Sequence, residues 1–149
     1  MSTKFVPALL LTLLPLTASA ELGGNAASVQ ADNNKLHAVM RATVSNGYTV
    51  HAIQTESGIT IREFLSTAGK VFAVSWDGPV MPDLQQLLGQ YFPAFSEAAA
   101  ARRHAGIRGP VAIAQDDLVV QSGGRMRAFA GRAYVPSLVP PQVTIDEIQ

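Results

Sequence analysis

A tryptophan, an aspartate and a turn stand together near the middle of the chain, and they are the first residues to consider for chemistry. Trp76-Asp77-Gly78-Pro79 follows a strand-like run, with Arg62 on the run before it and Tyr91 at the end of a helix-like run after it. Aromatic rings beside polar groups are common in ligand pockets. Trp76, Asp77, Tyr91 and Arg62 therefore form one candidate binding site. The alternative is that both aromatic side chains belong to the core and Asp77-Gly78 is only a turn.

Two arginines near the C-terminus form a second candidate site. Gly123-Gly124 is predicted to be a two-residue hairpin turn, because two glycines supply the positive φ values that such a turn requires. This turn would pair Ser122 with Arg125 and would place Arg125 and Arg127 on one face of the sheet. The two arginines could then bind an anion or a partner protein. The alternative is an ordinary solvated sheet face.

The sequence contains no recognisable motif for catalysis or metal binding. Its three histidines lie in unrelated segments, and it has no cysteine, so the usual metal-ligand spacings do not occur. A serine nucleophile motif of the form G-x-S-x-G and a glycine-rich phosphate loop are also missing. We therefore expect no metal and no cofactor, and an enzymatic role is the less favoured hypothesis.

The N-terminus indicates export. Lys4 precedes an apolar run from Phe5 to Leu16, and Ala18-Ser19-Ala20 has the pattern of a signal peptidase site. We predict a cleaved signal peptide over residues 1–20, a mature chain from Glu21 in the periplasm or the medium, and no transmembrane segment after cleavage. A membrane anchor is the weaker alternative, because an apolar run of about twelve residues is shorter than the roughly twenty needed to span a bilayer.

Length, charge and cysteine content narrow the class of protein. A chain of 149 residues is the length of one domain. Its formal net charge is zero, which argues against a nucleic-acid partner. Without cysteine the fold has no disulfides, so its stability must come from a hydrophobic core. We expect the partner to be an envelope or secreted protein, or a small ligand.

Strand patterns dominate the middle of the chain. Asn46-Gly47 predicts a hairpin between a strand at Val39 to Val44 and one at Tyr48 to Thr55. Ile59 to Leu65 and Val71 to Trp76 are predicted to be the next two strands. In the last of these the large side chains alternate with small ones, so Phe72, Val74 and Trp76 should face the core.

Before the Asn46-Gly47 hairpin the sequence gives weaker signals of secondary structure. Glu21 to Ala27 is small and glycine-containing, and we expect a flexible lead-in there. The apolar spacing from Ser28 to Met40 favours a short helix, although it competes with the strand that begins at Val39.

A change to helical spacing follows the strand at Val71 to Trp76. Leu84, Leu87, Leu88 and Tyr91 form one apolar stripe, which predicts a helix from about Pro82 to Tyr91. Pro93 should end or kink it. A second helix is predicted from Ser96 to His104, with Arg102-Arg103-His104 either complementing the helix end or binding an anion.

The remaining strands complete an α+β fold. Val111 to Ala114, Leu118 to Ser122 and Arg125 to Tyr134 have strand patterns, and Thr144 to Glu147 has the form of a capping box, which predicts a helical turn. We predict an antiparallel, largely meandering sheet of about six to seven strands, with one main helix packed on one face. The predicted organisation is a lead-in with a short helix and first strand over 21–47, one α+β domain over 48–136 and a tail over 137–149.

Several segments together resemble a known family. They are Leu22-Gly23-Gly24, Y-T-V-H from Tyr48, I-R-E-F-L-S-T-A-G-K-V-F-A-V-S-W-D-G-P from Ile61, P-D-L-Q-Q-L-L-G from Pro82, and S-G-G-R-M-R-A-F-A-G-R-A-Y from Ser122. The chain resembles the small exported bacterial proteins grouped as domain of unknown function 2844. The resemblance implies export from a bacterial cell, and it implies no activity, cofactor or catalytic residue.

Two functional hypotheses follow. The first is a non-enzymatic envelope or secreted module that binds its partner through a sheet face or edge. The second is a small, hydrolase-like enzyme whose site is assembled from Arg62, Glu63, Asp77 and Asp83 near the corner between Trp76 and Asp83. A deep polar pocket that holds at least two of these carboxylates would favour the second hypothesis, and separated, exposed side chains would rule it out.

Overall fold

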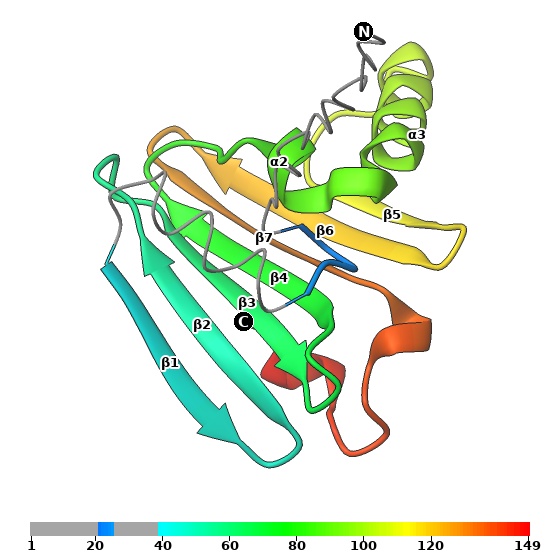
Figure 1. The fold of residues 1–149 in the computed structure, drawn as a ribbon. Helices are drawn as coiled ribbons and strands as arrows, with labels where there is room; N and C mark the ends of the chain where they lie inside the picture. Colours follow the sequence, from blue (N-terminus) through cyan, green and yellow to red (C-terminus); the bar gives the residue numbers. More distant parts are fainter. Residues whose placement is uncertain (1–20, 26–38) are drawn as a thin grey trace, which may run out of the picture.

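The structure, a computed structural model, describes residues 21–25 and 39–149. In this part of the chain seven antiparallel strands form one open sheet in the order β1-β2-β3-β4-β7-β6-β5 (Figure 1). The predicted α+β class and the largely meandering antiparallel sheet are confirmed. The strands are β1 (Val39–Ser45), β2 (Tyr48–Gln54), β3 (Thr60–Ser66), β4 (Val71–Gly78), β5 (Val111–Gln115), β6 (Leu118–Arg125) and β7 (Ala128–Tyr134).

The sheet is built from two meanders that meet at its centre. β1 to β4 pair in chain order, and the hairpin predicted at Asn46-Gly47 joins β1 to β2. The chain then crosses through the helices to the far edge and returns as β5, β6 and β7, so that β7 pairs with β4. This crossover brings β7 beside β4, although more than 40 residues separate them in sequence.

A bulge changes which side chains of β4 share a face. The register between β3 and β4 shifts at Phe64 and Leu65. As a result Val71, Val74 and Trp76 belong to one core cluster, whereas Phe72 belongs to a second cluster. The predicted grouping of Phe72 with Val74 and Trp76 is therefore wrong, because an extra residue in a bulge breaks the strict alternation of a strand.

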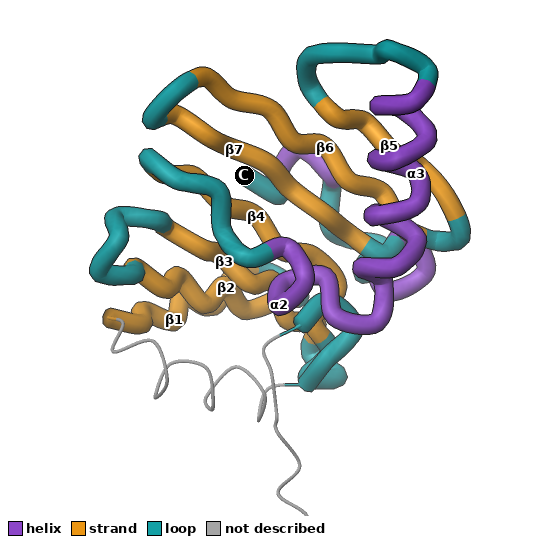
Figure 2. The backbone as a smooth tube through the Cα atoms, turned by 90° about the horizontal axis from the view of Figure 1, so that it is seen from above, coloured by secondary structure: helices purple, strands orange, loops and turns teal. Residues whose placement is uncertain are grey.

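The helical layer covers the face that carries Trp76. It consists of α2 (Leu84–Leu88), a 3-10 turn η1 (Gly89–Tyr91) and α3 (Phe92–His104), shown from above in Figure 2. Asp83 caps α2 by accepting hydrogen bonds from the backbone N–H groups of Gln85 and Gln86. The main helical segment thus begins near the predicted position. It continues to residue 104 because Pro93 lies in the first turn of α3, where a proline removes no helical hydrogen bond.

Residues 21–25 are packed into the fold, so the prediction of a flexible lead-in is wrong for them. Leu22 is fully buried, and its N–H donates to Leu87 O at 2.9 Å. Gly23 donates to Val71 O, and Val71 donates back to Gly24 O. This short segment joins β4 to the helical layer. The predicted signal peptide, and the predicted helix from Ser28 as far as residue 38, lie outside the described residues.

The opposite sheet face is covered by the C-terminal segment. After β7 come two 3-10 turns, η2 (Pro136–Leu138) and η3 (Ile145–Glu147), and the capping box predicted at Thr144 is present. Ile148 is fully buried there and Val143 nearly so, in a cluster with Phe64 and Phe72. The sheet therefore has a core on each face.

Candidate functional site

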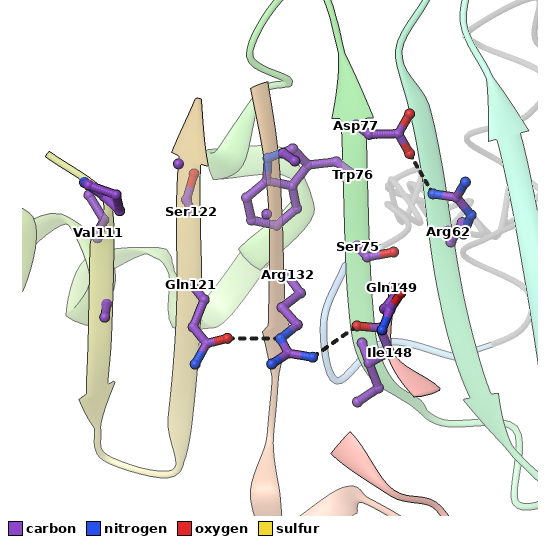
Figure 3. Close-up of a pocket in the computed structure, with 15 residues that line it drawn as sticks. Arg62, Ser75, Trp76, Asp77, Val111, Gln121, Ser122, Arg132, Ile148 and Gln149 are labelled. Atoms are coloured by element: carbon purple, nitrogen blue, oxygen red, sulfur yellow. Dashed lines mark hydrogen bonds and ion pairs between the residues drawn. The ribbon is translucent and has the colours of Figure 1, made fainter. Parts of the chain in front are cut away.

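A groove of about 530 Å³ lies on the sheet face that carries the C-terminal segment (Figure 3). Small residues form its floor, among them Ala112 on β5 and the paired residues Gly123 on β6 and Ala130 on β7. Ile148 and Gln149 border one end and Pro110 lies beside Gly123. The groove exists because these floor positions carry little or no side chain.

Polar residues from neighbouring strands form a row along this groove. Arg62 pairs in register with Ser75, Ser75 with Arg132, and Arg132 with Gln121. Paired residues on antiparallel strands point to the same face. Adjacent strands are about 4.8 Å apart, so the backbones of Arg62 and Arg132 are about 10 Å apart, with Ser75 between them.

The structure brings two of the predicted site residues into direct contact. Nη1 of Arg62 donates to Oδ1 of Asp77 at 2.6 Å, and both residues line the groove. Their side chains are 34% and 53% exposed. An ion pair this open to water contributes at most about 1 kcal/mol to folding, so both groups can exchange this partner for a ligand.

Arg132 is held differently. Its Nε donates to Oε1 of Gln121 at 2.9 Å, and its Nη1 donates to the backbone oxygens of Ile145 and Ile148 at 2.9 and 3.2 Å. These contacts tie the C-terminal segment to the sheet. All three acceptors are uncharged, and no carboxylate of the described residues lies within 4.0 Å of the guanidinium. The positive charge of Arg132 is therefore not neutralised by an ion pair.

Ser75 lies between the two arginines on β4. It is 2% exposed, and its hydroxyl has no hydrogen-bond partner among the described residues. Figure 3 shows this side chain on the strand between Arg132 and Arg62. Buried polar groups in folded proteins are nearly always hydrogen-bonded, so the Ser75 hydroxyl is an unused donor and acceptor next to the groove.

The aromatic half of the first candidate site lies in the core. The Trp76 side chain is 2% exposed and belongs to the cluster under the helices, and Tyr91 on η1 packs against the same cluster. Trp76 and its strand neighbour Gly131 are nevertheless among the residues that line the groove. Both aromatic side chains therefore pack with the core, as the alternative interpretation predicted. Tyr91 does not line the groove.

The second candidate site is not assembled as predicted. β6 runs through both glycines to Arg125, and the turn falls at Met126 and Arg127, where Arg127 has a φ of 64°. Ser122 pairs with Gly131 instead of Arg125, so Arg125 and Arg127 do not form a ledge on one strand face. Gly124 lies within β6, and the position requires glycine because a Cβ there would lie 2.7 Å from Ala128 O. Both arginines are exposed at the hairpin tip, outside the groove.

A smaller cavity of about 170 Å³ lies by the start of α2, lined by Glu63 and Asp83 together with apolar side chains such as Ile61 and Leu87. Glu63 is 1% exposed, and the carboxylate of Asp83 is engaged in capping α2. His51 pairs with Glu63 across β2 and β3, and burial lowers the pKa of its imidazole. The four dispersed residues of the enzyme hypothesis are thus divided, with Arg62 and Asp77 at the groove and the other two at this cavity.

Sequence reasoning found Arg62 and Asp77 but missed Ser75, Arg132 and Gln121. Ser75 is a polar residue within the apolar run from Val71 to Trp76, and Arg132 follows a glycine within a run of small residues. Either feature could have marked these positions. Their alignment in one row depends on β7 pairing with β4, which local patterns do not encode.

No group of three or more histidine, aspartate or glutamate side chains in the described part of the chain is placed to hold a metal ion. No helix within it is long and apolar enough to cross a membrane.

Comparison with known proteins gives one match. A family model with the description "Protein of unknown function (DUF2844)" matches residues 18–148. No curated protein and no solved structure matches the chain.

Proposed function

The chain belongs to the family of proteins of unknown function DUF2844, and we propose that it is a non-enzymatic binding module exported to the cell envelope or the medium of a bacterium. The observation that carries this proposal is the groove, where an apolar floor of small residues is bordered by the Arg62–Asp77 pair and by Arg132. Ligand sites combine mainly apolar walls with a few placed polar groups, and this groove has that composition.

Export is supported by the N-terminal sequence. Lys4, the apolar run after it and Ala18-Ser19-Ala20 have the order of a secretory signal. The absence of cysteine fits a chain that folds without needing to form disulfides after transport. Expression of the full chain in a bacterium, with fractionation and mass measurement, tests this part. We expect a product that begins at Glu21 in the periplasm or medium, and an uncleaved cytoplasmic product would contradict it.

Binding in the groove is tested by filling it. Ala130 is exposed on the floor, so Ala130→Phe should occupy the groove without disturbing the core. Ala128→Phe is the matched control, since residue 128 lies on the same strand and face but pairs with Arg125 outside the groove. Components of an envelope extract that bind the wild type and Ala128→Phe but not Ala130→Phe would support the proposal. Equal retention of these components by the wild type and both variants, or by none of the three proteins, would contradict it.

A second candidate function, a small hydrolase-like enzyme, is favoured by the cavity that holds both Glu63 and Asp83. Two carboxylates with different surroundings can divide the roles of acid and base. The engagement of Asp83 as a helix cap weighs against it. Screening the purified chain against ester, amide and glycoside substrates distinguishes the two functions. Turnover that is abolished by Glu63→Gln and unaffected by Ala130→Phe would favour the enzyme.

A further inference from the structure

We propose that the groove recognises an oxyanion, a carboxylate or phosphate group carried on a small apolar body, with Arg62, Ser75 and Arg132 as its donors. This inference rests on the proposed function, because it names the ligand class for the same groove. Three donors on adjacent strands β3, β4 and β7 point to one sheet face and lie in one row. Neighbouring donors that include charged guanidinium groups are suited to binding an anion, because hydrogen bonds to charged groups are the strong ones.

The Ser75 hydroxyl supplies the observation that points to a ligand. Its side chain is 98% buried, lies within the groove lining, and has no hydrogen-bond partner in the part of the chain that the structure describes. A buried hydroxyl without a partner is costly, and such groups are usually satisfied by water or by a ligand. The oxygen of a bound anion would accept the hydrogen bond that Ser75 does not make in the protein.

Arg132 supplies the charge. Its Nε and Nη1 are committed to Gln121 and to the C-terminal segment, which fixes the orientation of the guanidinium. Its Nη2 donates to no described residue, so this planar group still has free donors. A positioned guanidinium whose charge lacks an acidic partner is well suited to a carboxylate or phosphate.

Without a ligand, the Arg62 guanidinium is paired with the Asp77 carboxylate. The pair is exposed to solvent, so an incoming anion competes with the Asp77 carboxylate for the same guanidinium. Asp77 is also a negative charge on the rim of the groove, and it opposes anion binding. This arrangement predicts that removal of the Asp77 charge strengthens anion binding, whereas a purely structural role of the ion pair predicts no gain.

The apolar floor of the groove determines which group the bound anion should carry. Ala112, Gly123 and Ala130 give a flat apolar surface, and Pro110 adds an apolar edge beside Gly123. A free inorganic anion would leave this surface in contact with water. An anion attached to a compact apolar group would instead cover the floor and gain hydrophobic contact.

Titration of the full mature chain with three related probes tests the inference. Phenyl phosphate and benzoate carry a phosphate or a carboxylate on the same ring, and phenol is the neutral control. We expect both anions to bind at least about tenfold more tightly than phenol by calorimetry, since hydrogen bonds between charged groups are the strong ones. The comparison of phenyl phosphate with benzoate identifies the preferred anion, and equal binding of all three probes would overturn the inference.

Variants of the row give the second test. Arg62→Gln and Ser75→Ala should each weaken anion binding by roughly three- to tenfold. Asp77→Asn should tighten anion binding by about threefold or more, because it frees Arg62 and removes a repelling charge. Arg125→Gln, at the exposed hairpin tip, is the matched control and should leave binding unchanged. Weaker binding in Asp77→Asn, or an equal loss in Arg125→Gln, would overturn the inference.

The outcomes separate this inference from the proposed function. If Ala130→Phe abolishes binding of phenol and the anions alike, and all bind the wild type equally, the groove binds ligands without anion recognition. If no probe binds, and Ala130→Phe retains every extract component that the wild type retains, both the proposed function and the oxyanion inference fail. Thermal unfolding of each variant verifies that the fold is intact, and Asp77→Asn, an exposed substitution that should increase affinity, cannot mimic the result of unfolding.

Discussion

Gly131 and Trp76 are in close contact across β4 and β7. A Cβ on Gly131 would overlap Cζ2 and Cε2 of Trp76, whose ring lies over this position on the neighbouring strand. A glycine is required here by the close approach of the ring, since its backbone angles are ordinary for a strand. The packing of the buried indole thus depends on the absence of a side chain at residue 131.

Gly131→Val is expected to destabilise the protein by about 1 to 3 kcal/mol, because the buried indole has no free space into which it can move. Urea unfolding measures this change in the free energy of unfolding. The control is Gly123→Ala, where the added Cβ would meet Pro110 at 3.5 Å, an ordinary contact. We expect that control to stay within about 0.5 kcal/mol of the wild type, and an equal loss in both variants would contradict the close packing at Gly131.

The Glu147 carboxylate makes the stability of the fold depend on pH. Its pKa is held below the ordinary value by hydrogen bonds from Thr144, with a further bond from the Tyr48 hydroxyl at 2.9 Å. Because the folded pKa is depressed, this carboxylate stabilises the fold above about pH 4.3, the usual glutamate value, and the contribution is lost as the pH falls through the folded pKa. Glu147→Gln should therefore show a flatter loss of melting temperature below pH 4.3. Parallel curves for the two proteins would be inconsistent with this role.

At the scale of elements, the helical layer is short and depends on packing. α2 has only five residues, which is too few for a helix to persist without tertiary contacts. Leu88 is fully buried between this helix and the sheet, and the N-terminal segment at Leu22 is hydrogen-bonded to the residue beside it. The layer is held by its leucines more than by its intrinsic helix propensity.

Leu88→Ala is expected to cost about 2 to 5 kcal/mol of unfolding free energy, since the cavity lies at the junction of helix, sheet and N-terminal segment. Thermal and urea unfolding report the loss. Gln85→Ala on the exposed side of α2 keeps helix propensity and should change stability by less than about 0.5 kcal/mol. Comparable losses in the two variants would show that α2 is not anchored through Leu88.

Local patterns predicted most of these elements, and the errors have identifiable physical causes. The hairpin at Asn46-Gly47 and the capping box at Thr144 were found because each is complete within a few residues. The turn after β6 was misplaced because neither Gly123 nor Gly124 has a positive φ, and Gly124 instead lies where a Cβ would be 2.7 Å from Ala128 O. The groove was missed because its row joins strands from two meanders, and only the tertiary pairing of β4 with β7 creates it.

At the scale of the whole molecule, the C-terminal segment is a structural cover for one sheet face. Ile148 is fully buried against the cluster that contains Phe64 and Phe72. Arg132 fixes the backbone of the same segment by two hydrogen bonds. The groove is bordered by this cover, so its shape depends on the last residues of the chain.

Ile148→Ala should therefore destabilise the protein by about 2 to 4 kcal/mol, because it leaves a cavity beneath the cover. Ile107→Ala is a matched control, since the same substitution there affects a side chain that is 50% exposed. We expect that control to change the free energy of unfolding by less than about 1 kcal/mol. Chemical unfolding of both variants compares them directly, and similar values would mean that residue 148 is not part of the core.

The two meanders meet at a seam, the pairing of β4 with β7, and this seam affects the order in which the chain folds. Each meander has only contacts between strands that are close in sequence, so each can form quickly. Pairing of β4 with β7 closes a loop that contains the whole helical layer and strands β5 and β6. Closing such a long loop is slow because it costs conformational entropy. We expect docking of the two meanders to be the rate-limiting step. The groove would then be the last feature to appear during folding and the first to be lost when the seam opens.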